Sequence, residues 1–525
     1  QAEDGIRDLV RSRGLGDVYK RQIKGDVDGS VEALTDSFEN LSTEEIQVNI
    51  IFKGVGAITE SDVLLASASQ AIIVGFNVKP TDSARKLSEK EQIKLAQQNI
   101  VNFYANENVN PYVAISAMGP WIVTLKGAVI YDCGGYGMLG LGHSPKLALN
   151  EIKKPHVMAN VMTPSLSQME FIDILKKEIG HSRTNKSTFT EFCCLNSGSE
   201  SVSIGARLAD VNAKELTAKG AKHFGKTIAR LTLSGSFHGR TDRPAQFSDS
   251  TRSSYKKHLK SFENKNDLFT VTPNDIDELK EVFKKAEKEN IFFEAFFMEP
   301  VMGEGNPGQA ISPEFYDEAR KLTKESGTLL LIDSIQAGLR AQGVLSIIDY
   351  PGFENSECPD METYSKALNA GQYPLSVLAM TGKASELYRQ GIYGNTMTSN
   401  PKALDVASAV IKFINPEIRK NIRDRGLELV EKLNALSQEL KSDVTNVQGT
   451  GLLASCELSE EYKCYGENST EEYLRKNGLG VIHGGINSLR YTPCFQITSE
   501  EVDLIVDLTR DALINGPKKQ GNTSH

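Results

Sequence analysis

The stretch Gly-Thr-Leu-Leu-Leu-Ile-Asp at residues 327–333 decides the fold class. It is a continuous apolar run that stops at a carboxylate, as expected of a buried parallel strand that delivers a charged group to a site at its C-terminal end. A buried carboxylate needs a cationic partner. The run therefore predicts an α/β protein with a functional site beside Asp333.

Further stretches predict strands that end in polar or aromatic residues. They are 189–195, followed by Asn-Ser-Gly-Ser-Glu-Ser (196–201); 228–233, followed by Ser-Gly-Ser-Phe-His-Gly-Arg-Thr (234–241); and 292–298, followed by Glu299-Pro300. The first of these turns leads into a predicted helix over about 201–218. Small residues between a strand and a helix N-terminus let backbone N–H groups converge on a phosphate.

Lys366, in Ser-Lys-Ala-Leu-Asn-Ala-Gly, is the natural counterpart of Asp333. If the partner of Asp333 is the protonated ring nitrogen of pyridoxal phosphate, Lys366 is the amine that holds the aldehyde as a Schiff base. A strand-end Asp and a loop Lys occur in most α/β domains. The pair taken alone therefore also fits an ordinary structural role.

Other motifs extend this pattern in a fixed order. Gly-Gly-Tyr-Gly-Met-Leu-Gly-Leu-Gly-His-Ser-Pro (134–145) precedes the phosphate loop, Thr396 with Ser399-Asn400-Pro401 follows Lys366, and Arg490-Tyr-Thr-Pro comes last. With Asp-x-x-Gln at 333–336, these motifs make the chain from about Gln97 to Gly516 resemble the class III aminotransferases, the ornithine, acetylornithine and 4-aminobutyrate transaminase group. The resemblance implies an aminotransferase-type fold with a large, mostly parallel sheet domain and a small α+β domain.

It also implies a transaminase that uses pyridoxal phosphate to move an amino group from an amino acid or ω-amine donor to a keto acid such as 2-oxoglutarate. In such an enzyme Asp333 keeps the pyridinium nitrogen protonated, and Lys366 holds the cofactor and then moves the proton at the substrate Cα. The resemblance also implies that Phe237 and Ile335 lie on the two faces of the cofactor ring and that Gln336 binds the ring hydroxyl. Gly198 and Ser199 bind the phosphate, together with Thr396, which comes from the partner subunit. The last of these implies a homodimer.

Arg490 resembles the family's arginine for the substrate carboxylate, a group that its planar fork suits. In the family's ω-transaminases, a glutamate at the position of Glu304 pairs with this arginine when the donor has no carboxylate beside its amine. The presence of both residues implies a dual-substrate enzyme; a surface ion pair worth less than about 1 kcal/mol is the alternative. Trp121 and Tyr136 fall where the family places pocket aromatics, and each can equally be a core residue.

The sequence departs from the family around Asp333. The family usually has Asp-Glu-Val-Gln-Thr-Gly-Phe-Gly-Arg-Thr-Gly where this chain has Asp-Ser-Ile-Gln-Ala-Gly-Leu-Arg-Ala-Gln-Gly (333–343). Ser334 replaces a glutamate and Leu339 an aromatic residue. The substrate preference of the better-known members therefore does not carry over.

Gly-Ala-Lys-His-Phe-Gly-Lys-Thr (220–227) fits the Walker A pattern of nucleotide-binding loops. A P-loop follows a buried strand and opens a helix, whereas here a helical, polar stretch comes first and a strand-like run, 228–233, follows. The reversed order removes the helix dipole and the amide cradle, so we do not expect nucleotide binding at this stretch.

Residues 24 to about 92 resemble a different protein, the third domain of the GTPase-type bacterial translation initiation factor. The resemblance rests on Gly-Asp-Val-Asp-Gly-Ser-Val-Glu-Ala-Leu (25–34) and Ala-Ile-Ile-Val-Gly-Phe-Asn-Val (71–78). In that factor the domain is a spacer between the GTPase core and the module that binds initiator tRNA, so the fragment alone is not expected to perform initiation chemistry. The predicted elements are strands at 48–52 and 71–78 and helices at 31–41 and 59–68.

Residues 1–22 fit neither family and lack the apolar core of a secretory signal. They look like translated vector or adapter sequence, which suggests a chimeric reading frame; a natural fusion is the alternative. The expected organisation is a leader at 1–22, the initiation-factor fragment at 23–82, a junction at 83–96, a small domain combining 97–159 with 401–516, a large cofactor-binding domain at 160–400, and a tail at 517–525.

Composition favours a cytoplasmic enzyme. The formal net charge of −9 gives no electrostatic reason to expect a nucleic-acid partner, and no apolar run approaches the roughly 20 residues that span a bilayer. The seven cysteines, without a Cys-x-x-Cys pair, are typical of reduced thiols, and the eight histidines show no metal-ligand spacing. Two other functions stay open: a same-fold aminomutase or decarboxylase, and a translation-associated binding protein without a cofactor.

Overall fold

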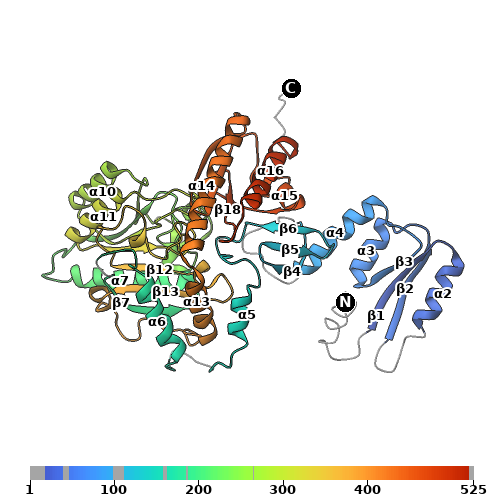
Figure 1. Cartoon of the computed structure of the whole chain (residues 1–525), viewed down its shortest axis with the longest axis horizontal. Coiled ribbons are helices and arrows are strands. Elements are labelled where there is room, and N and C mark those ends of the chain that lie inside the picture. The colour runs from blue at the N-terminus through green and yellow to red at the C-terminus, as the bar shows by residue number, and fades with distance from the viewer. Residues whose placement is uncertain are drawn as a thin grey trace. The chain divides into compact units, whose positions relative to one another are not determined.

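The structure is a computed structural model that describes residues 18–39, 47–97, 111–157, 162–184, 187–263 and 265–519 (Figure 1). The chain forms two compact units, Gln1–Val113 and Ala114–His525. Most of the predicted leader at 1–22 and most of the predicted tail at 517–525 lie outside the described residues. No helix in the described ranges is both long and apolar enough to cross a membrane.

The first unit contains a parallel sheet of three strands in the order β2-β1-β3. Its elements are β1 (Val18–Gly25), α2 (Asp28–Glu39), β2 (Gln47–Val55), α3 (Glu60–Ser69), β3 (Ile72–Phe76) and α4 (Asp82–Gln97). Parallel neighbours need crossover connections, which α2 and α3 supply. The predicted strands and helices are confirmed to within a few residues, and the stretch predicted as a junction, 83–96, is part of α4.

The second unit is built around a seven-stranded sheet in the order β7-β13-β12-β11-β10-β8-β9, in which only β13 runs against its neighbours. Its strands are β7 (Phe189–Leu195), β8 (Thr227–Leu233), β9 (Leu268–Val271), β10 (Ile291–Met298), β11 (Leu329–Asp333), β12 (Met361–Tyr364) and β13 (Ser376–Thr381). Every residue of the central strand β11 is buried. The mostly parallel sheet expected from the sequence is confirmed.

Helices cover both faces of this sheet. Alternate side chains of β11 join two different buried clusters, as expected for a strand that is covered on both sides. One cluster includes residues of α10 (Ile276–Lys288) and α11 (Pro313–Ser326), and the other includes residues of α7 (Gly198–Leu216), which lies on the other side of the sheet in Figure 1. A Cβ at Gly205 of α7 would lie 2.4 Å from Leu331, so this close approach of helix and sheet requires glycine.

Two four-stranded sheets complete the second unit, in the orders β14-β15-β18-β17 and β16-β6-β5-β4. Their strands are β4 (Ala114–Met118), β5 (Trp121–Thr124), β6 (Val129–Asp132), β14 (Val444–Thr450), β15 (Leu453–Leu458), β16 (Leu479–Gly480), β17 (Ile482–Gly484) and β18 (Ser488–Tyr491). Because β16 pairs with β6, two distant segments assigned to one small domain do meet. The exact domain boundaries stay predictions.

The second unit also contains the following helices and 3-10 turns. They are α5 (Lys146–Ile152), α6 (Leu166–Glu178), α8 (Asp242–Ala245), α9 (Arg252–His258), α12 (Gly382–Ser385), α13 (Pro401–Phe413), α14 (Pro416–Glu439), α15 (Thr470–Lys476) and α16 (Ser499–Asn515), with 3-10 turns η1 (Lys260–Phe262), η2 (Ile347–Asp349) and η3 (Lys366–Asn369).

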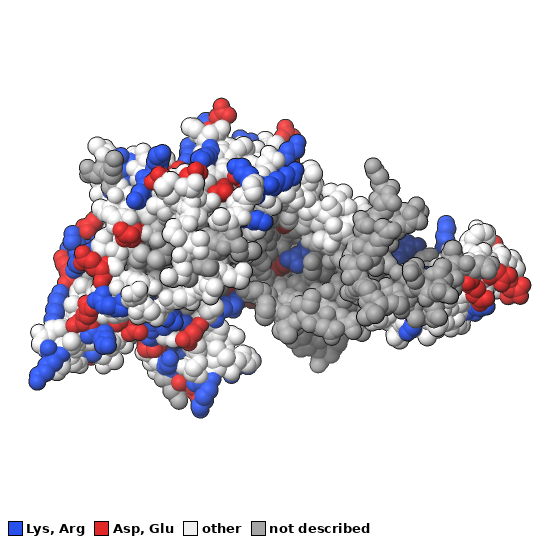
Figure 2. Space-filling model, turned by 90° about the horizontal axis from the view of Figure 1, so that it is seen from below, with Lys and Arg blue, Asp and Glu red and all other residues white. Residues whose placement is uncertain are grey.

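Two sequence expectations concerned nucleotides and nucleic acid. The Walker-like stretch 220–227 follows α7 and runs into β8, which is the helix-then-strand order predicted, and its Lys226 forms an ion pair with Glu287. The face of the molecule in Figure 2 carries Lys and Arg interspersed with Asp and Glu over much of its area. The stretch 220–227 therefore lacks the strand-then-helix order of a P-loop.

Candidate active site

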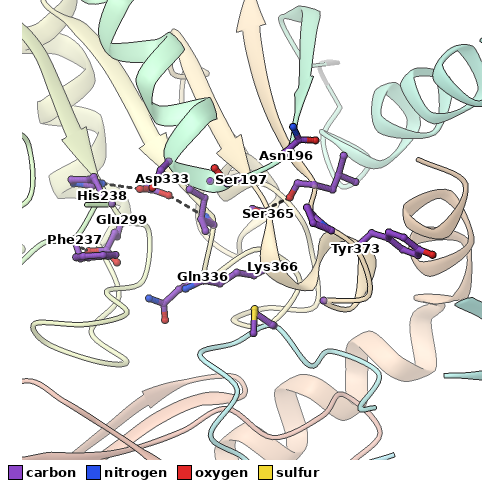
Figure 3. Close-up of a pocket in the computed structure, with 18 of the residues that line it drawn as sticks. Asn196, Ser197, Phe237, His238, Glu299, Asp333, Gln336, Ser365, Lys366 and Tyr373 are labelled. Atoms are coloured by element: carbon purple, nitrogen blue, oxygen red, sulfur yellow. Dashed lines mark hydrogen bonds and ion pairs between the residues drawn. The ribbon is translucent and has the colours of Figure 1, made fainter. Parts of the chain in front are cut away.

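A cavity of about 430 Å³ lies where the central strands of the seven-stranded sheet end (Figure 3). The carboxyl ends of parallel strands are where open α/β sheets place their ligands. The cavity brings together the predicted catalytic residues and most of the predicted cofactor residues, namely Gly198, Ser199, Phe237, Asp333, Ile335, Gln336 and Lys366. The turn at 371–375 and Met138, for which no role was predicted, also line it.

The first turn of α7 forms one end of the cavity. The Ser197 hydroxyl accepts a hydrogen bond from the Glu200 N–H (3.4 Å), and the Glu200 carboxylate accepts one from the Ser197 N–H (3.0 Å). This capping box leaves the N–H groups of Gly198 and Ser199 without an acceptor inside the helix. A Cβ at Gly198 would lie 2.6 Å from Ile335, so the site keeps the smallest residue here. Such a helix end suits a phosphate group.

Asp333 ends β11 and is held by hydrogen bonds in the cavity. Its Oδ2 lies 2.8 Å from Nδ1 of His238, and its Oδ1 accepts from the Thr363 hydroxyl and the Ile335 N–H, both at 3.2 Å. Nε2 of His238 lies 3.1 Å from the Thr232 hydroxyl. No role was predicted for His238, although its place beside Phe237 in the Ser-Phe-His-Gly-Arg-Thr motif was a usable signal.

Glu299 is a second buried acid in the cavity that sequence analysis left without a role. Its carboxylate accepts hydrogen bonds from the N–H groups of Phe237 (3.0 Å) and Gly303 (2.9 Å). Burial raises the pKa of Glu299 to about 7, against the lowering effect of His238. The signal in the sequence was its position at the end of a strand-like run.

Lys366 follows β12 at the start of η3, with a φ of 47°. A left-handed backbone costs a residue with a side chain about 1–2 kcal/mol, so the surrounding packing must hold it in place. Burial, followed by the positive charge of Arg490, lowers the pKa of the Lys366 amine from 10.5 to about 7. The carboxylates of Glu304, Asp333 and Glu299 act in the opposite direction. A large share of the amine is therefore neutral and nucleophilic at neutral pH.

Arg490 lies on β18 and is 1% exposed. Its Nη1 donates to the carbonyl of Gly303 and to Oε1 of Gln336 (3.3 Å), and its guanidinium lies 5.3 Å from the centre of the Tyr136 ring. Its buried Nε has no hydrogen-bond partner among the described residues. Burial lowers the pKa of this guanidinium.

Glu304 forms its ion pair with Arg240 in this structure, and the pair with Arg490 that the resemblance implies for an ω-amine donor stays a prediction. Its carboxylate lies 3.4 Å from the Arg240 guanidinium, which also lies 5.2 Å from the centre of the Phe237 ring. The physical reason is that Nη1 of Arg490 is already engaged by oxygen atoms of Gly303 and Gln336. The charge of Glu304 still raises the pKa of Arg490, against the effect of burial.

Five residues predicted for the site do not line the cavity, namely Trp121, Tyr136, Glu304, Thr396 and Arg490. Thr396 is exposed in the loop before α13, and Trp121 on β5 is 39% exposed and packs edge-on against Tyr131, with 5.0 Å between the ring centres. Tyr136 approaches the site through its contact with Arg490. The roles assigned to these five residues stay predictions.

The residues present fit pyridoxal phosphate. In the described part of the chain, Asp333 has an ion-pair contact with His238 and none with Lys or Arg, so its carboxylate can serve a protonated ring nitrogen. Lys366 supplies an amine with a pKa near 7, and the first turn of α7 supplies N–H donors beside a glycine. These features match the pyridine nitrogen, the aldehyde and the phosphate of the cofactor.

A family model for the class III aminotransferases matches residues 103–513. The chain belongs to this family. The enzyme is 26% identical over 418 residues to the acetylornithine aminotransferase of Lactococcus lactis subsp. lactis, a match that covers 79% of this chain and all of the relative. A structure of the Toxoplasma gondii ornithine aminotransferase, described as showing partial occupancy of PLP at its active site, matches with a TM-score of 0.66 and 20% identity and covers 81% of this chain and 94% of that one. The aminotransferase fold predicted from the sequence is thereby confirmed.

A second family model, for translation-initiation factor 2, matches residues 11–107. Over 98 residues the chain is 64% identical to translation initiation factor IF-2 of Christiangramia forsetii, which is 18% of this chain and 10% of the factor. The chain thus spans about a tenth of the length of this relative. The initiation-factor fragment predicted from the sequence is confirmed, but the match begins at residue 11, so the expectation that all of residues 1–22 fit neither family was wrong.

Proposed function

We propose that this class III aminotransferase uses pyridoxal phosphate to move an amino group from an amino acid or ω-amine donor to a keto acid such as 2-oxoglutarate. One observation carries the proposal. A single cavity holds a lysine amine with a pKa of about 7, Lys366, and a buried carboxylate fixed by a histidine, Asp333. A lysine whose pKa is strongly lowered, in one cavity with a buried carboxylate, is typical of catalytic sites.

The polar ends of the cofactor are bound by Asp333 and by the first turn of α7. Asp333 pairs with the protonated ring nitrogen, and its hydrogen bonds to His238 and Thr363 keep the carboxylate in place. The N–H groups of Gly198 and Ser199 bind the phosphate.

The ring itself is bound by side chains around the cavity. Phe237 and Ile335 pack on its faces. Gln336 donates its amide N–H to the ring hydroxyl, because its carbonyl oxygen already accepts from Arg490 at 3.3 Å. The ring plane and the reacting bonds of the substrate are thereby held in a defined relation.

Bound pyridoxal phosphate supplies a ring that accepts the electron pair left when the substrate Cα loses its proton. Lys366 moves that proton. Burial and the charge of Arg490 keep part of its amine neutral at pH 7, which is the form that takes up a proton.

Arg490 binds the substrate carboxylate. Its buried Nε has no hydrogen-bond partner among the described residues and would donate to the carboxylate of glutamate or 2-oxoglutarate. For an ω-amine donor, Glu304 pairs with Arg490 in place of the substrate. The present pair of Glu304 with Arg240 has side chains 26% and 39% exposed, so it is weak and easily exchanged.

The active form is a homodimer in which Thr396 of the partner subunit reaches the phosphate. Thr396 is exposed and does not line the cavity of its own chain, which fits a role in a second copy. Large apolar side chains are also exposed on the second unit, among them Met118 (72%), Met162 (83%) and Met397 (71%). Such exposure is typical of a surface that another protein covers.

Amino transfer is tested by incubating the purified protein with pyridoxal phosphate, 2-oxoglutarate and a panel of ω-amino acids and diamines. Mass spectrometry should show glutamate formed mole for mole with the deaminated donor. Release of carbon dioxide, or a shift of the amino group within the donor without glutamate, would identify a decarboxylase or an aminomutase instead.

A further inference from the structure

Arg340 is a buried arginine with no ion pair to a carboxylate among the described residues. Its side chain is fully buried, and its guanidinium lies 5.1 Å from the centre of the Phe495 ring. Its Nη2 has no hydrogen-bond partner in the part of the chain that the structure describes, and burial lowers the pKa of this guanidinium to about 10. Because burying an unpaired cation is unfavourable, the residue needs a compensating role.

Carbonyl oxygens from three separate segments accept the hydrogen bonds of Arg340. Its Nε donates to Gly137 (3.3 Å), and its Nη1 donates to Leu452 (3.2 Å) and to Pro493. The Leu452 N–H in turn donates to the Arg340 carbonyl (3.1 Å). One side chain in the loop after β11 therefore joins three segments that are distant in the sequence. A planar fork with five N–H donors suits this task, whereas lysine offers only a compact charge.

Two of these segments carry the substrate end of the site. Gly137 follows Tyr136, whose ring lies beside Arg490. Pro493 lies three residues after Arg490 in the same segment. The Gly137 N–H donates to the Thr492 hydroxyl at 3.3 Å, which ties the two segments to each other. Arg340 therefore lies where the positions of Tyr136 and Arg490 are set together.

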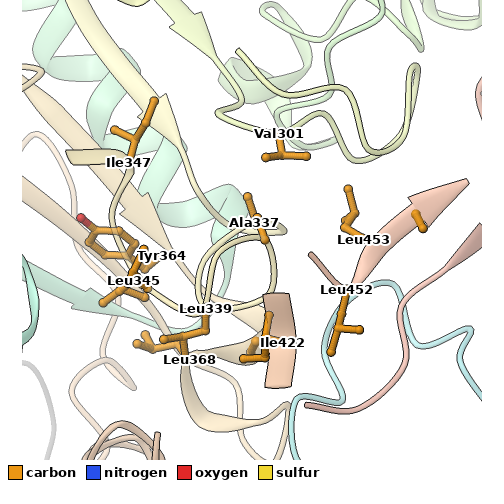
Figure 4. Close-up of a cluster of buried hydrophobic side chains, with 14 of the residues drawn as sticks. Val301, Ala337, Leu339, Leu345, Ile347, Tyr364, Leu368, Ile422, Leu452 and Leu453 are labelled. Atoms are coloured by element: carbon orange, nitrogen blue, oxygen red, sulfur yellow. The ribbon is translucent and has the colours of Figure 1, made fainter. Parts of the chain in front are cut away.

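The loop that carries Arg340 begins at the cofactor end of the site. It starts after Asp333 and contains Gln336, which accepts a hydrogen bond from Arg490. Figure 4 shows the apolar side of this loop, where Leu339 lies in the same buried cluster as Ile422. A shift of this loop would change the separation of the two halves of the site.

We propose that Arg340 is a positioning residue that sets the distance between the cofactor-binding loop and the carboxylate clamp of Tyr136 and Arg490. It thereby determines the affinity for substrates that carry a carboxylate beside the reacting carbon. The proposal rests on the proposed function of Arg490. Without the guanidinium, three buried carbonyl oxygens lose these donors, and the hydrogen bond of the Gly137 N–H to the Thr492 hydroxyl is left to join the two segments of the clamp. Misplacement by about 1 Å in such a site can cost about 100-fold in rate.

Glutarate is a suitable probe, because it carries two carboxylates and cannot accept an amino group. Its binding to the holoenzyme is measured by thermal stabilisation. Arg340→Lys and Arg340→Gln should weaken glutarate by about tenfold or more and raise the KM for 2-oxoglutarate by a similar factor. The visible absorbance of the bound cofactor, and the half-reaction of a donor without an α-carboxylate, should stay essentially unchanged.

Arg320→Lys is the matched control. Arg320 is also buried, at 9% exposure, but it donates to Asp360, which precedes β12 and also accepts from the Leu330 N–H near the start of β11. These contacts lie at the amino ends of the strands, away from the cavity. The control should lower the melting temperature without changing glutarate affinity.

Wild-type glutarate affinity in Arg340→Gln, together with its loss in Arg490→Met, would overturn the role of Arg340 and leave the proposed function standing. Equal losses in both half-reactions would also overturn it, because they indicate general damage. Normal glutarate binding by Arg490→Met would instead count against the proposed function itself. If Arg340→Gln does not fold, Thr492→Val removes the acceptor of the Gly137 N–H while keeping the arginine; weaker glutarate binding supports the proposal, and unchanged binding overturns it.

Discussion

Capture of pyridoxal phosphate by the apoprotein should follow the titration of Lys366, with a midpoint near pH 7. Burial and Arg490 lower the pKa of this amine from 10.5 to about 7, so the neutral form dominates above pH 7 and is lost as the pH falls below it. At pH 7 about half of the amine is neutral, compared with about one part in 3,000 for an ordinary lysine. Capture at pH 7 should therefore be about a thousandfold faster than by an exposed lysine.

The assay mixes apoprotein with pyridoxal phosphate in a stopped-flow instrument between pH 5.5 and 9.5 and follows the visible absorbance of the bound cofactor. Nα-acetyl-lysine run in parallel corrects for titration of the cofactor. Two variants should move the midpoint in opposite directions: Arg490→Met raises it by removing a positive charge, and Glu304→Gln lowers it by removing a negative one. Lys284→Met, at an exposed lysine paired with Glu281, is the control and should leave the midpoint unchanged.

A wild-type midpoint above about pH 9 would show that Lys366 has an ordinary pKa, and the argument from burial would be wrong. Midpoints that move in the same direction in Arg490→Met and Glu304→Gln would refute the electrostatic part of the reasoning, because charges of opposite sign cannot act alike on one amine.

Three further predictions concern the substrate clamp, the ring carboxylate and the first unit. Arg490→Lys should lower kcat/KM for 2-oxoglutarate and glutamate by about 30- to 900-fold, or roughly 2–4 kcal/mol, and should spare amine donors without an α-carboxylate. Glu304→Ala should slow ω-amine transfer and let α-amino acids compete better. Equal effects of the two substitutions on both half-reactions would show that the pair is structural. Asp333→Asn should retain some cofactor but lose several orders of magnitude in kcat, and near-normal turnover would remove Asp333 from the ring nitrogen. Deleting residues 1–96 should leave activity and cofactor affinity essentially unchanged, because every residue assigned to the site lies in the second unit; loss of activity on truncation would indicate a functional fusion.

The elements around the site could be predicted where local sequence determines structure. The apolar run before Asp333 forms β11, and the small residues after β7 open α7, because both depend on patterns within a few residues. The family motifs then identified some of the side chains that line one cavity, such as Phe237 and Lys366, since a family's reaction constrains residue types at fixed positions.

Contacts between distant segments could not be predicted in this way. Asp333 forms a hydrogen bond with His238, which follows a different strand. Glu304 forms an ion pair with Arg240, while Arg490 donates hydrogen bonds to Gly303 and Gln336. The left-handed backbone of Lys366 and its lowered pKa depend on burial and on charges from several strands. Such properties belong to the packed molecule and leave no local pattern in the sequence.

The most direct test of the central claim is the substitution Lys366→Ala. The variant protein should remain folded, with a melting temperature close to that of the wild type in the absence of cofactor, and should lose both amino transfer to 2-oxoglutarate and the visible absorbance of the covalently bound cofactor. If Lys366→Ala instead transfers amino groups at the wild-type rate, Lys366 has no place in the mechanism and the account of this site is wrong.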